Sequence, residues 1–394
     1  MAPKILSTRV TSGNAVPIRV LFVASALGIG GSQHVLIEIL KHLNRDMFDI
    51  HLALLEDGGD FRDRVPRDVS VHALGVHRAR MAVLPVAYLC RKLRPNVILS
   101  FAAQLNAAVI VAQLFMPRKT RILAREGANV TLPIVASPLR RAVYRAVYAY
   151  ADLVICQSDD MVERLTTCFR IPKHKLMRIY NPVDAVGLRE LAQGPSPYDD
   201  IGPNLVAVSR FVPVKGVDLL IEAMPAILRA QPNAVLTLVG GGPQESHLRG
   251  LAQTIGVAHV TRFVGFQANP HTFIYNADLL VIPSRSEAFS NVALEALALG
   301  TPVVATDCPG GIREIARHVN NLTLTAGMDP ISLATAINSA LTHRHDRDAN
   351  HEIDRRFLRE FSLERIIALY ERTIVDAAGL RGQGTATREQ AIAR

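Results

Sequence analysis

Short apolar runs alternate with longer amphipathic stretches along the chain, and this alternation occurs twice. In the first half the apolar runs begin at Ile18, Asp49, Asn96, Arg121 and Asp152. In the second half they begin at Asn204, Ala234, Val260, Asp278 and Thr301. Continuous β-branched runs between helix-length segments are typical of parallel strands that are buried on both faces. The pattern predicts an α/β fold with two Rossmann-like, doubly wound parallel-sheet domains.

The boundary between the two halves is expected in a stretch rich in proline and glycine, Asn181 to Pro203, because both residues break regular elements. A chain of 394 residues exceeds what one hydrophobic core usually serves, which agrees with two domains. The predicted order is an N-terminal domain (1–184), a linker (185–203), a C-terminal domain (204–355), a C-terminal helix (356–378) and a polar tail (379–394).

The composition is that of a folded protein without a disulfide framework. The four cysteines are widely separated and form no Cys-x-x-Cys spacing, which favours a reducing compartment. The N-terminus lacks the apolar core of a signal peptide. The longest apolar stretch, Val97 to Phe115, contains three side-chain amides, whereas a membrane-spanning helix needs about 20 mostly apolar residues. We therefore expect a cytoplasmic protein, either soluble or peripheral on a membrane.

The net charge of +9 is concentrated in the first half of the chain. Up to Asp184 there are 25 Lys and Arg against 14 Asp and Glu, and beyond it 19 against 21. This imbalance favours an anionic partner for the first half of the chain. Nucleic acid has little further support, because aromatic residues do not interleave with the basic ones.

One basic amphipathic segment offers a specific candidate for an anionic partner. Arg140, Arg141 and Arg145 share the predicted helix Leu139 to Tyr150 with several apolar residues. Such a helix can rest on anionic lipid at the inner face of a membrane. The alternative is an ordinary domain helix that buries its apolar side against the sheet.

Candidate ligand-binding residues follow the predicted strands, where open α/β sheets bind ligands. Gly28-Ile29-Gly30-Gly31-Ser32 leads from the first strand into a helix, where it could approach a phosphate or form only a tight turn. Arg210 and Lys215 follow a later strand and suit a diphosphate, although they could also be solvated surface charges. Gly240-Gly241-Gly242-Pro243 follows the next strand and offers a further close approach or a turn.

The most informative segment runs from Val281 to Ile315. Glu287 follows a strand, and Glu295 lies on the helix that is expected to begin near Ser290. Eight residues of helix span roughly 12 Å, so one carboxylate could reach a sugar and the other the ribose of the same nucleotide sugar. An acid among apolar helix neighbours requires a partner, unless Glu295 faces solvent.

This segment, PSRSEAFSNVALEALALGTPVVATDCPGG, closely resembles the signature of the retaining glycosyltransferases of family 4, whose fold is GT-B. The family's Glu, seven residues, Glu spacing is matched by Glu287 and Glu295. The resemblance extends over most of the chain through IGGSQHVLIEILKHL, SFAAQLNA, YNPVD, SRFVPVKGVDLLIEA and REFSLERIIALYE. The last of these resembles the helix that crosses back to the N-terminal domain. Some similar members build bacterial surface polysaccharides.

The resemblance implies a role for each matched position. Arg210 and Lys215 would hold the donor diphosphate and stabilise the leaving group, Glu287 would contact the transferred sugar, and Glu295 the ribose. The helix that starts at Ser290 would offer backbone N–H groups to the phosphates. The implied donor site comprises Gly30, Gly31, Arg210, Lys215, Gly241, Glu287, Ala288, Phe289, Ser290, Asn291, Val292 and Glu295. The implied reaction retains the anomeric configuration by front-face attack, with a UDP- or GDP-linked hexose as donor.

Two positions depart from the family pattern. Ala288 replaces the usual glycine after the first glutamate, where it could crowd the sugar. Where many members carry a histidine, this chain reads AREGAN, so Arg125, Glu126 and Asn129 are assigned to the acceptor side. The implied acceptor is a glycan or a lipid-diphosphate-linked sugar.

Other enzyme classes fit the sequence less well. Asp346-Arg347-Asp348 has the letters of a metal-binding motif but lies in a charged stretch far from any strand end, so no metal and no cofactor are expected. A nucleotide-sugar epimerase or a phosphorylase would share the two-domain fold. An NAD-dependent oxidoreductase would need a Gly-x-Gly-x-x-Gly fingerprint, which is absent.

Overall fold

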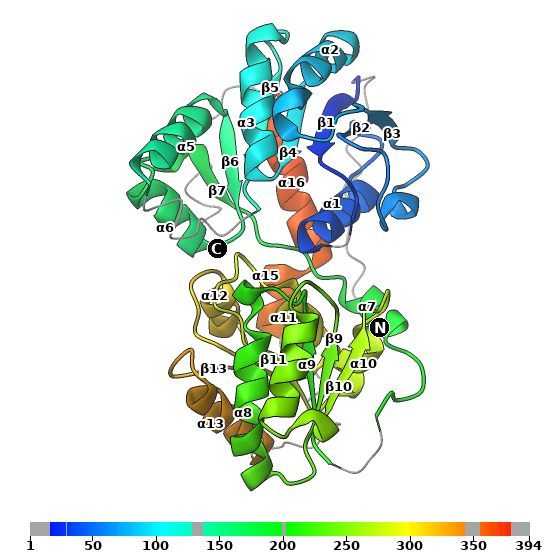
Figure 1. Ribbon diagram of the computed structural model, residues 1–394. Coiled ribbons are helices and arrows are strands. Elements are labelled where there is room, and N and C mark those ends of the chain that lie inside the picture. Colours follow the sequence, from blue (N-terminus) through cyan, green and yellow to red (C-terminus); the bar gives the residue numbers. More distant parts are fainter. Residues whose placement is uncertain (1–15, 29, 128–136, 199–201, 343–354, 380–394) are drawn as a thin grey trace.

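The computed structural model describes residues 16–28, 30–127, 137–198, 202–342 and 355–379. Two α/β domains lie one above the other in Figure 1, each built on a parallel sheet. The predicted fold class is confirmed, and every strand expected from an apolar run is present.

The N-terminal sheet has seven strands in the order β3-β2-β1-β4-β5-β6-β7. Its strands are β1 (Ile18–Ala24), β2 (Phe48–Leu54), β3 (Ser70–Ala73), β4 (Val97–Phe101), β5 (Arg121–Arg125), β6 (Leu153–Cys156) and β7 (Leu176–Arg178). The helices of this domain are α1 (Gly31–His42), α2 (Val83–Leu93), α3 (Ala103–Ala112), α5 (Pro138–Tyr150) and α6 (Asp159–Thr167). Helix α1 packs against one face of the sheet, and α2, α3, α5 and α6 pack against the other.

The C-terminal sheet has six strands in the order β10-β9-β8-β11-β12-β13. Its strands are β8 (Asn204–Val208), β9 (Val235–Val239), β10 (Thr261–Gly265), β11 (Leu279–Ile282), β12 (Val303–Ala305) and β13 (Leu322–Leu324). Its helices are α8 (Val217–Ala230), α9 (Glu245–Thr254), α10 (His271–Asn276), α11 (Asn291–Leu299), α12 (Ile312–Arg317) and α13 (Pro330–Thr342). In both sheets the order reverses beside the first strand, which places a ligand-binding edge at the carboxyl ends of β1 and β8.

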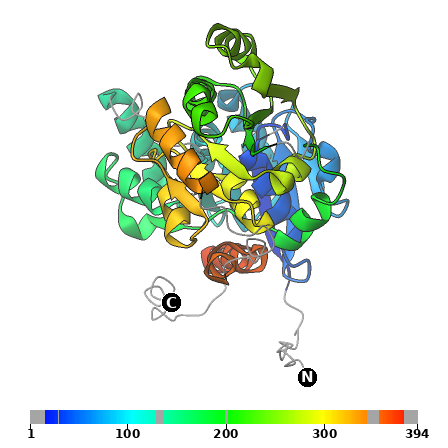
Figure 2. The same cartoon turned by 90° about the horizontal axis from the view of Figure 1, so that it is seen from below.

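The segment expected to be the linker, 185–203, contains a helix, α7 (Ala185–Leu191), which packs on α10 and α11. At the other end of the C-terminal domain, α15 (Arg355–Phe361) is followed by α16 (Leu363–Ala377), which Ser362 caps. Val183 and Ser362 form an isolated parallel bridge, so the two chain segments that connect the domains lie side by side. Figure 2, turned by 90°, shows α16 along one side of the molecule.

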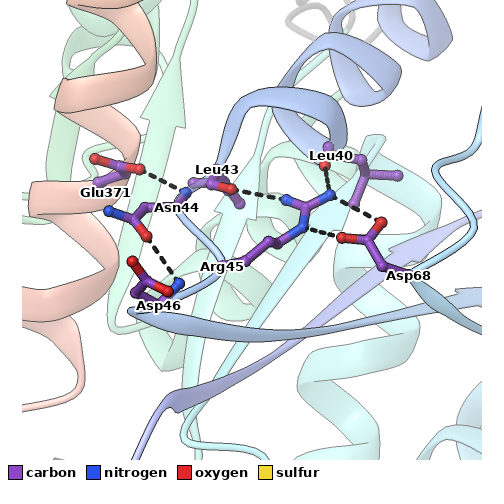
Figure 3. A network of polar contacts seen from close by, with 7 residues as sticks. All are labelled: Leu40, Leu43, Asn44, Arg45, Asp46, Asp68 and Glu371. Atoms are coloured by element: carbon purple, nitrogen blue, oxygen red, sulfur yellow. Dashed lines mark hydrogen bonds and ion pairs between the residues drawn. The ribbon is translucent and has the colours of Figure 1, made fainter.

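Helix α16 is fastened to the N-terminal domain by polar contacts as well as by packing. The Glu371 carboxylate accepts a hydrogen bond from the backbone N–H of Asn44 at 2.8 Å. Figure 3 shows this contact beside the guanidinium of Arg45, which donates to the Leu40 and Leu43 carbonyls and to Asp68. The turn after α1 is thereby fixed both to the segment that leads into β3 and to α16. Among the described helices, none has the length and apolarity that crossing a membrane requires.

Candidate active site

Lys215 is held at the carboxyl end of β8 by a turn that requires glycine. The turn is a short 3-10 helix, Pro213–Lys215, which ends at Gly216. Gly216 has φ 62°, and a Cβ atom there would lie 2.0 Å from the carbonyl oxygen of Pro283. The turn that carries the lysine therefore packs against the carboxyl end of β11, the strand that Glu287 follows.

Glu287 and Lys215 form an ion pair at the centre of the candidate site. The Lys215 Nζ lies 2.6 Å from Glu287 Oε1, and the Ser284 hydroxyl donates to the same oxygen at 2.7 Å. Glu287 is 7% exposed, so its carboxylate is fixed in direction by these two donors. Burial, with a contribution from Glu287, raises the pKa of the neighbouring Cys308 thiol to about 11. The thiol is consequently neutral at physiological pH and is not a nucleophile in this state.

A second ion pair braces the turn that carries Lys215. The Arg285 guanidinium binds both Asp218 carboxylate oxygens, at 2.8 and 2.6 Å, and also donates to the Pro213 carbonyl at 2.8 Å. These hydrogen bonds hold the pKa of Asp218 below its usual value, against the effect of burial. Sequence reasoning missed both residues. Arg285 stands two positions before Glu287 at the same strand end, which is a signal that could have identified it.

The N-terminus of α11 opens onto the site without a cap. Ser290 occupies the N-cap position but makes no capping hydrogen bond, and its hydroxyl has no partner among the described residues although the residue is 2% exposed. The first turn of a helix leaves backbone N–H groups unsatisfied and carries a partial positive charge. A buried, unpartnered hydroxyl beside free N–H groups fits an anionic ligand at this helix end.

Asn291 joins the C-terminal domain to the glycine loop of the N-terminal domain. Its side-chain N–H donates to the Gly31 carbonyl at 3.0 Å, and its side-chain oxygen accepts from Asn181 at 2.6 Å. A Cβ atom at Gly31 would lie 2.8 Å from the Asn291 amide nitrogen, so a side chain there would displace Asn291. Gly30 precedes it as the N-cap of α1. The contact brings the two predicted phosphate-binding segments together.

The remaining donor-side residues surround this centre. Glu295 lies 3.6 Å from the imidazole of His271, which gives the half-buried carboxylate a polar partner. Arg210 is exposed after β8, and the carbonyl of Gly241 accepts a hydrogen bond from Phe211 at 2.9 Å. The rest of the α11 segment faces the interface: Ala288 is partly buried against the core of the N-terminal domain, Phe289 stacks on Tyr180 with ring centroids 5.1 Å apart, and Val292 is partly buried.

Arg125 and Glu126 lie at the end of β5, and both are fully buried. The Arg125 guanidinium donates to the Ser32 hydroxyl at 3.3 Å, the Asn181 side-chain oxygen at 2.7 Å and the Tyr370 hydroxyl at 3.0 Å. It thus connects the start of α1, the end of the N-terminal domain and α16.

The Glu126 carboxylate accepts hydrogen bonds from the Tyr148 hydroxyl and the Gly127 N–H. Asn106 also donates to Tyr148. Asn129, the third residue assigned to the acceptor side, lies outside the described residues, as do Asp346 and Asp348.

A further contact between the domains was not predicted. Glu314 of α12 reaches the N-terminus of α6 and accepts hydrogen bonds from the backbone N–H groups of Asp159, at 2.8 Å, and Asp160, at 3.0 Å. A carboxylate is favoured at a helix N-terminus. Burial nevertheless raises the pKa of Glu314 above its usual value. No sequence signal predicts this contact, because its partners are about 155 residues apart and belong to different domains.

Comparison with known proteins agrees with this geometry. Residues 29–186 match the family described as Glycosyltransferase Family 4, and residues 195–356 match Glycosyl transferases group 1. An uncharacterized glycosyltransferase of Methanocaldococcus jannaschii is 34% identical over 48% of this chain and 50% of its own length. The chain spans about half the length of the first curated relatives that it matches.

Other relatives match over more of their length. The N-acetylgalactosamine-N,N'-diacetylbacillosaminyl-diphospho-undecaprenol 4-alpha-N-acetylgalactosaminyltransferase of Campylobacter jejuni is 26% identical over 75% of this chain and 82% of its own. Among solved structures, HepE of Anabaena in complex with UDP and glucose has a TM-score of 0.76 at 22% identity, covering 91% of this chain and 100% of its own. The two family matches together span most of the chain and meet at the boundary between the two sheets. The chain therefore belongs to glycosyltransferase family 4 and has the GT-B fold.

Proposed function

We propose that the protein transfers a hexose-type sugar from UDP to a glycan or a lipid-diphosphate-linked acceptor, with retention of the anomeric configuration, in bacterial polysaccharide biosynthesis in the cytoplasm. The observation that carries the proposal is the uncapped N-terminus of α11, with its buried and unpartnered Ser290 hydroxyl, next to the Lys215–Glu287 pair. This arrangement supplies N–H groups and a cation for a diphosphate, together with a carboxylate for a sugar.

The names and bound ligands of similar proteins support the choice of substrates. HepE has been solved with UDP, with UDP and glucose, and with UDP-glucose. The Campylobacter jejuni relative is named for a sugar transfer to a diphospho-undecaprenol-linked acceptor. A uridine donor and a lipid-linked acceptor are therefore the first pair of substrates to test.

In the proposed reaction, Arg210 and Lys215 bind the diphosphate and stabilise the negative charge that develops on it as the glycosidic bond breaks. Glu287, fixed by Lys215 and Ser284, accepts hydrogen bonds from the sugar hydroxyls, and Glu295 accepts them from the ribose. The acceptor attacks from the side on which the diphosphate leaves. No metal is required in this scheme, because the two cationic side chains and the α11 N–H groups face the phosphates.

Thermal stabilisation tests the donor. UDP and UDP-hexoses at about 100 times their dissociation constant are expected to stabilise the protein by about 2.7 kcal/mol. GDP, GDP-sugars and NAD at the same concentrations are expected to stabilise it much less. Glu295→Ala should reduce the shift with UDP, because a ribose contact is lost. Glu163→Ala replaces an exposed glutamate on α6, in the N-terminal domain, and is the matched control that should leave the shift unchanged. A shift with NAD alone would leave the fold intact and refute the proposed function.

Arg285 is expected to act through Lys215. Arg285→Ala should raise the donor KM about tenfold, with a smaller change in kcat, because loss of the bidentate pair frees the turn that carries Lys215. Arg285→Lys should recover only part of the effect, since an ammonium group lacks the planar pair of N–H donors that matches the two Asp218 oxygens. Arg249→Ala removes an exposed ion pair on α9 and is the control. Equal kinetic constants for Arg285→Ala and the wild type would contradict this role.

A further inference from the structure

Glu295, the carboxylate proposed to bind the ribose, has a histidine beside it on a neighbouring helix. His271 stands at the start of α10, which packs on α11, the helix that carries Glu295 (Figure 1). The His271 Nε2 lies 3.6 Å from Glu295 Oε2. Only 11% of the histidine side chain and 18% of the glutamate side chain are exposed, so water and salt screen this pair weakly.

The contacts of Asn269 fix which ring nitrogen of His271 carries a proton. The Asn269 side-chain nitrogen donates to the Leu191 carbonyl at 2.6 Å, so the amide oxygen is the atom that faces His271. That oxygen accepts a hydrogen bond from the backbone N–H of His271 at 3.1 Å, and it lies 2.9 Å from Nδ1. An amide oxygen has no proton to give, so Nδ1 is the donor in this contact.

The proton on Nδ1 decides what Nε2 can do. In the neutral ring Nε2 then carries a lone pair, which the Glu295 carboxylate repels. In the imidazolium both nitrogens are protonated, and the ring forms an ion pair with Glu295. A carboxylate that is largely withdrawn from water needs such a compensating charge. Within the described part of the chain the Glu295 carboxylate accepts no hydrogen bond, so its oxygens are available to hydroxyl groups of a ligand.

We propose that His271 is a positioning residue, which as the imidazolium orients the Glu295 carboxylate toward the two vicinal hydroxyls of the donor ribose. Asn269 holds the ring, and α7 holds Asn269 through the Leu191 carbonyl. Without the imidazolium charge Glu295 is free to rotate and recognises the ribose less well, whereas Lys215 and the α11 N–H groups still bind the diphosphate. This role of His271 deepens the proposed function and rests on its assignment of Glu295 to the ribose.

The charges on the helices around His271 are consistent with this pairing. Helices α11 and α7 pack against α10. Glu295 is the charged residue of α11, and α7 carries Arg189 and Glu190, which are both exposed. Charges of opposite sign in water largely offset each other. Glu295 therefore dominates the electrostatic environment of the His271 ring.

Ribose recognition is measured separately from diphosphate binding by comparing UDP with its dideoxy analogue, which lacks both ribose hydroxyls. The ratio of the two dissociation constants is obtained by isothermal titration calorimetry. The wild type is expected to bind UDP about tenfold to a hundredfold more tightly, the range for hydrogen bonds to a charged group. His271→Phe should lower this ratio about tenfold, because the carboxylate is no longer held, and should leave the affinity for the dideoxy analogue nearly unchanged.

The pH dependence of this ratio separates a charge on His271 from a structural role. In the wild type the ratio should fall as the pH rises from about 6 to about 8, because histidine side chains lose their second proton in this interval. Titration of the terminal phosphate affects both ligands alike and cancels in the ratio. His271→Gln keeps N–H donors without a charge, so its ratio should be low at both pH values. His259→Gln replaces an exposed histidine of the same domain and should behave as the wild type does.

Glu295→Ala distinguishes a failure of this role from a failure of the proposed function. If Glu295→Ala lowers the ratio but both His271 variants keep the wild-type ratio, the ribose contact stands and the role of His271 is overturned. If Glu295→Ala leaves the ratio unchanged, the assignment of Glu295 to the ribose fails and the role of His271 falls with it. A wild-type ratio that is independent of pH, or equal losses of affinity for both ligands in His271→Phe, would also overturn the role.

Discussion

Lys215→Ala is expected to lower kcat for sugar transfer by about 10² to 10³, because preorganised charge at a leaving group contributes on that scale. The lysine pairs with Glu287 and stands on a turn that is fixed by Gly216 and by the Arg285–Asp218 pair. Its Nζ therefore needs little reorganisation when the diphosphate leaves. The measurement is steady-state transfer from UDP-hexose to a lipid-linked acceptor.

The interpretation of this variant depends on the fold remaining intact. The substitution removes the Lys215 donor from Glu287 and leaves the hydrogen bond from the Ser284 hydroxyl, so the unfolding transition must be measured beside the rate. Arg249→Ala breaks an exposed pair with Glu245 on α9 and should leave both quantities unchanged. Turnover of Lys215→Ala near the wild-type value, with a normal unfolding transition, would remove Lys215 from the mechanism.

Arg125→Met should destabilise the N-terminal domain by about 3 kcal/mol, the second large effect that we expect. Methionine fills much of the same volume but donates no hydrogen bond to Ser32, Asn181 or Tyr370. Asn181 and Tyr370 are buried and would lose this partner away from water, which is costly, whereas Ser32 is only partly buried. Denaturant unfolding followed by circular dichroism, together with hydrogen exchange in α16, measures the loss.

Arg121→Met supplies the matched control for this change. It makes the same substitution on the same strand, but Arg121 is exposed and its pair with Asp152 contributes at most about 1 kcal/mol. Equal unfolding free energies for the two variants would show that the buried contacts of Arg125 add nothing. Faster exchange in α16 for Arg125→Met alone would locate the effect at Tyr370.

Three strands were not predicted from the sequence, and the physical reason is the same for each. β3, β7 and β13 are three or four residues long and stand at the edges of their sheets, and they contain few fully buried residues. An edge strand is covered on fewer sides, so it lacks the continuous apolar run that marks a central strand. Of the ten strands that were predicted, only β10 stands at the edge of a sheet.

The candidate site was predictable to the extent that its residues follow strands. Lys215, Glu287 and the start of α11 stand at strand ends, where position alone indicates a ligand. The contacts of Asn291 with Gly31, and of Glu314 with α6, depend on how the two domains face each other. Nothing in local periodicity encodes that arrangement. The burial of Arg125 was equally hidden, because its partner Tyr370 is 245 residues away.

The bridge between Val183 and Ser362 has a consequence for engineering the enzyme. Because α16 belongs structurally to the N-terminal domain, the C-terminal domain is an insertion whose two ends are adjacent in space. A chimaera that exchanges one C-terminal domain for another would best replace residues 184–361 as a single cassette. Helix α16 would then stay with the N-terminal domain, which it contacts through Glu371 and Tyr370. A simple fusion of one protein's first half to another's second half would instead mismatch α16 with its binding face.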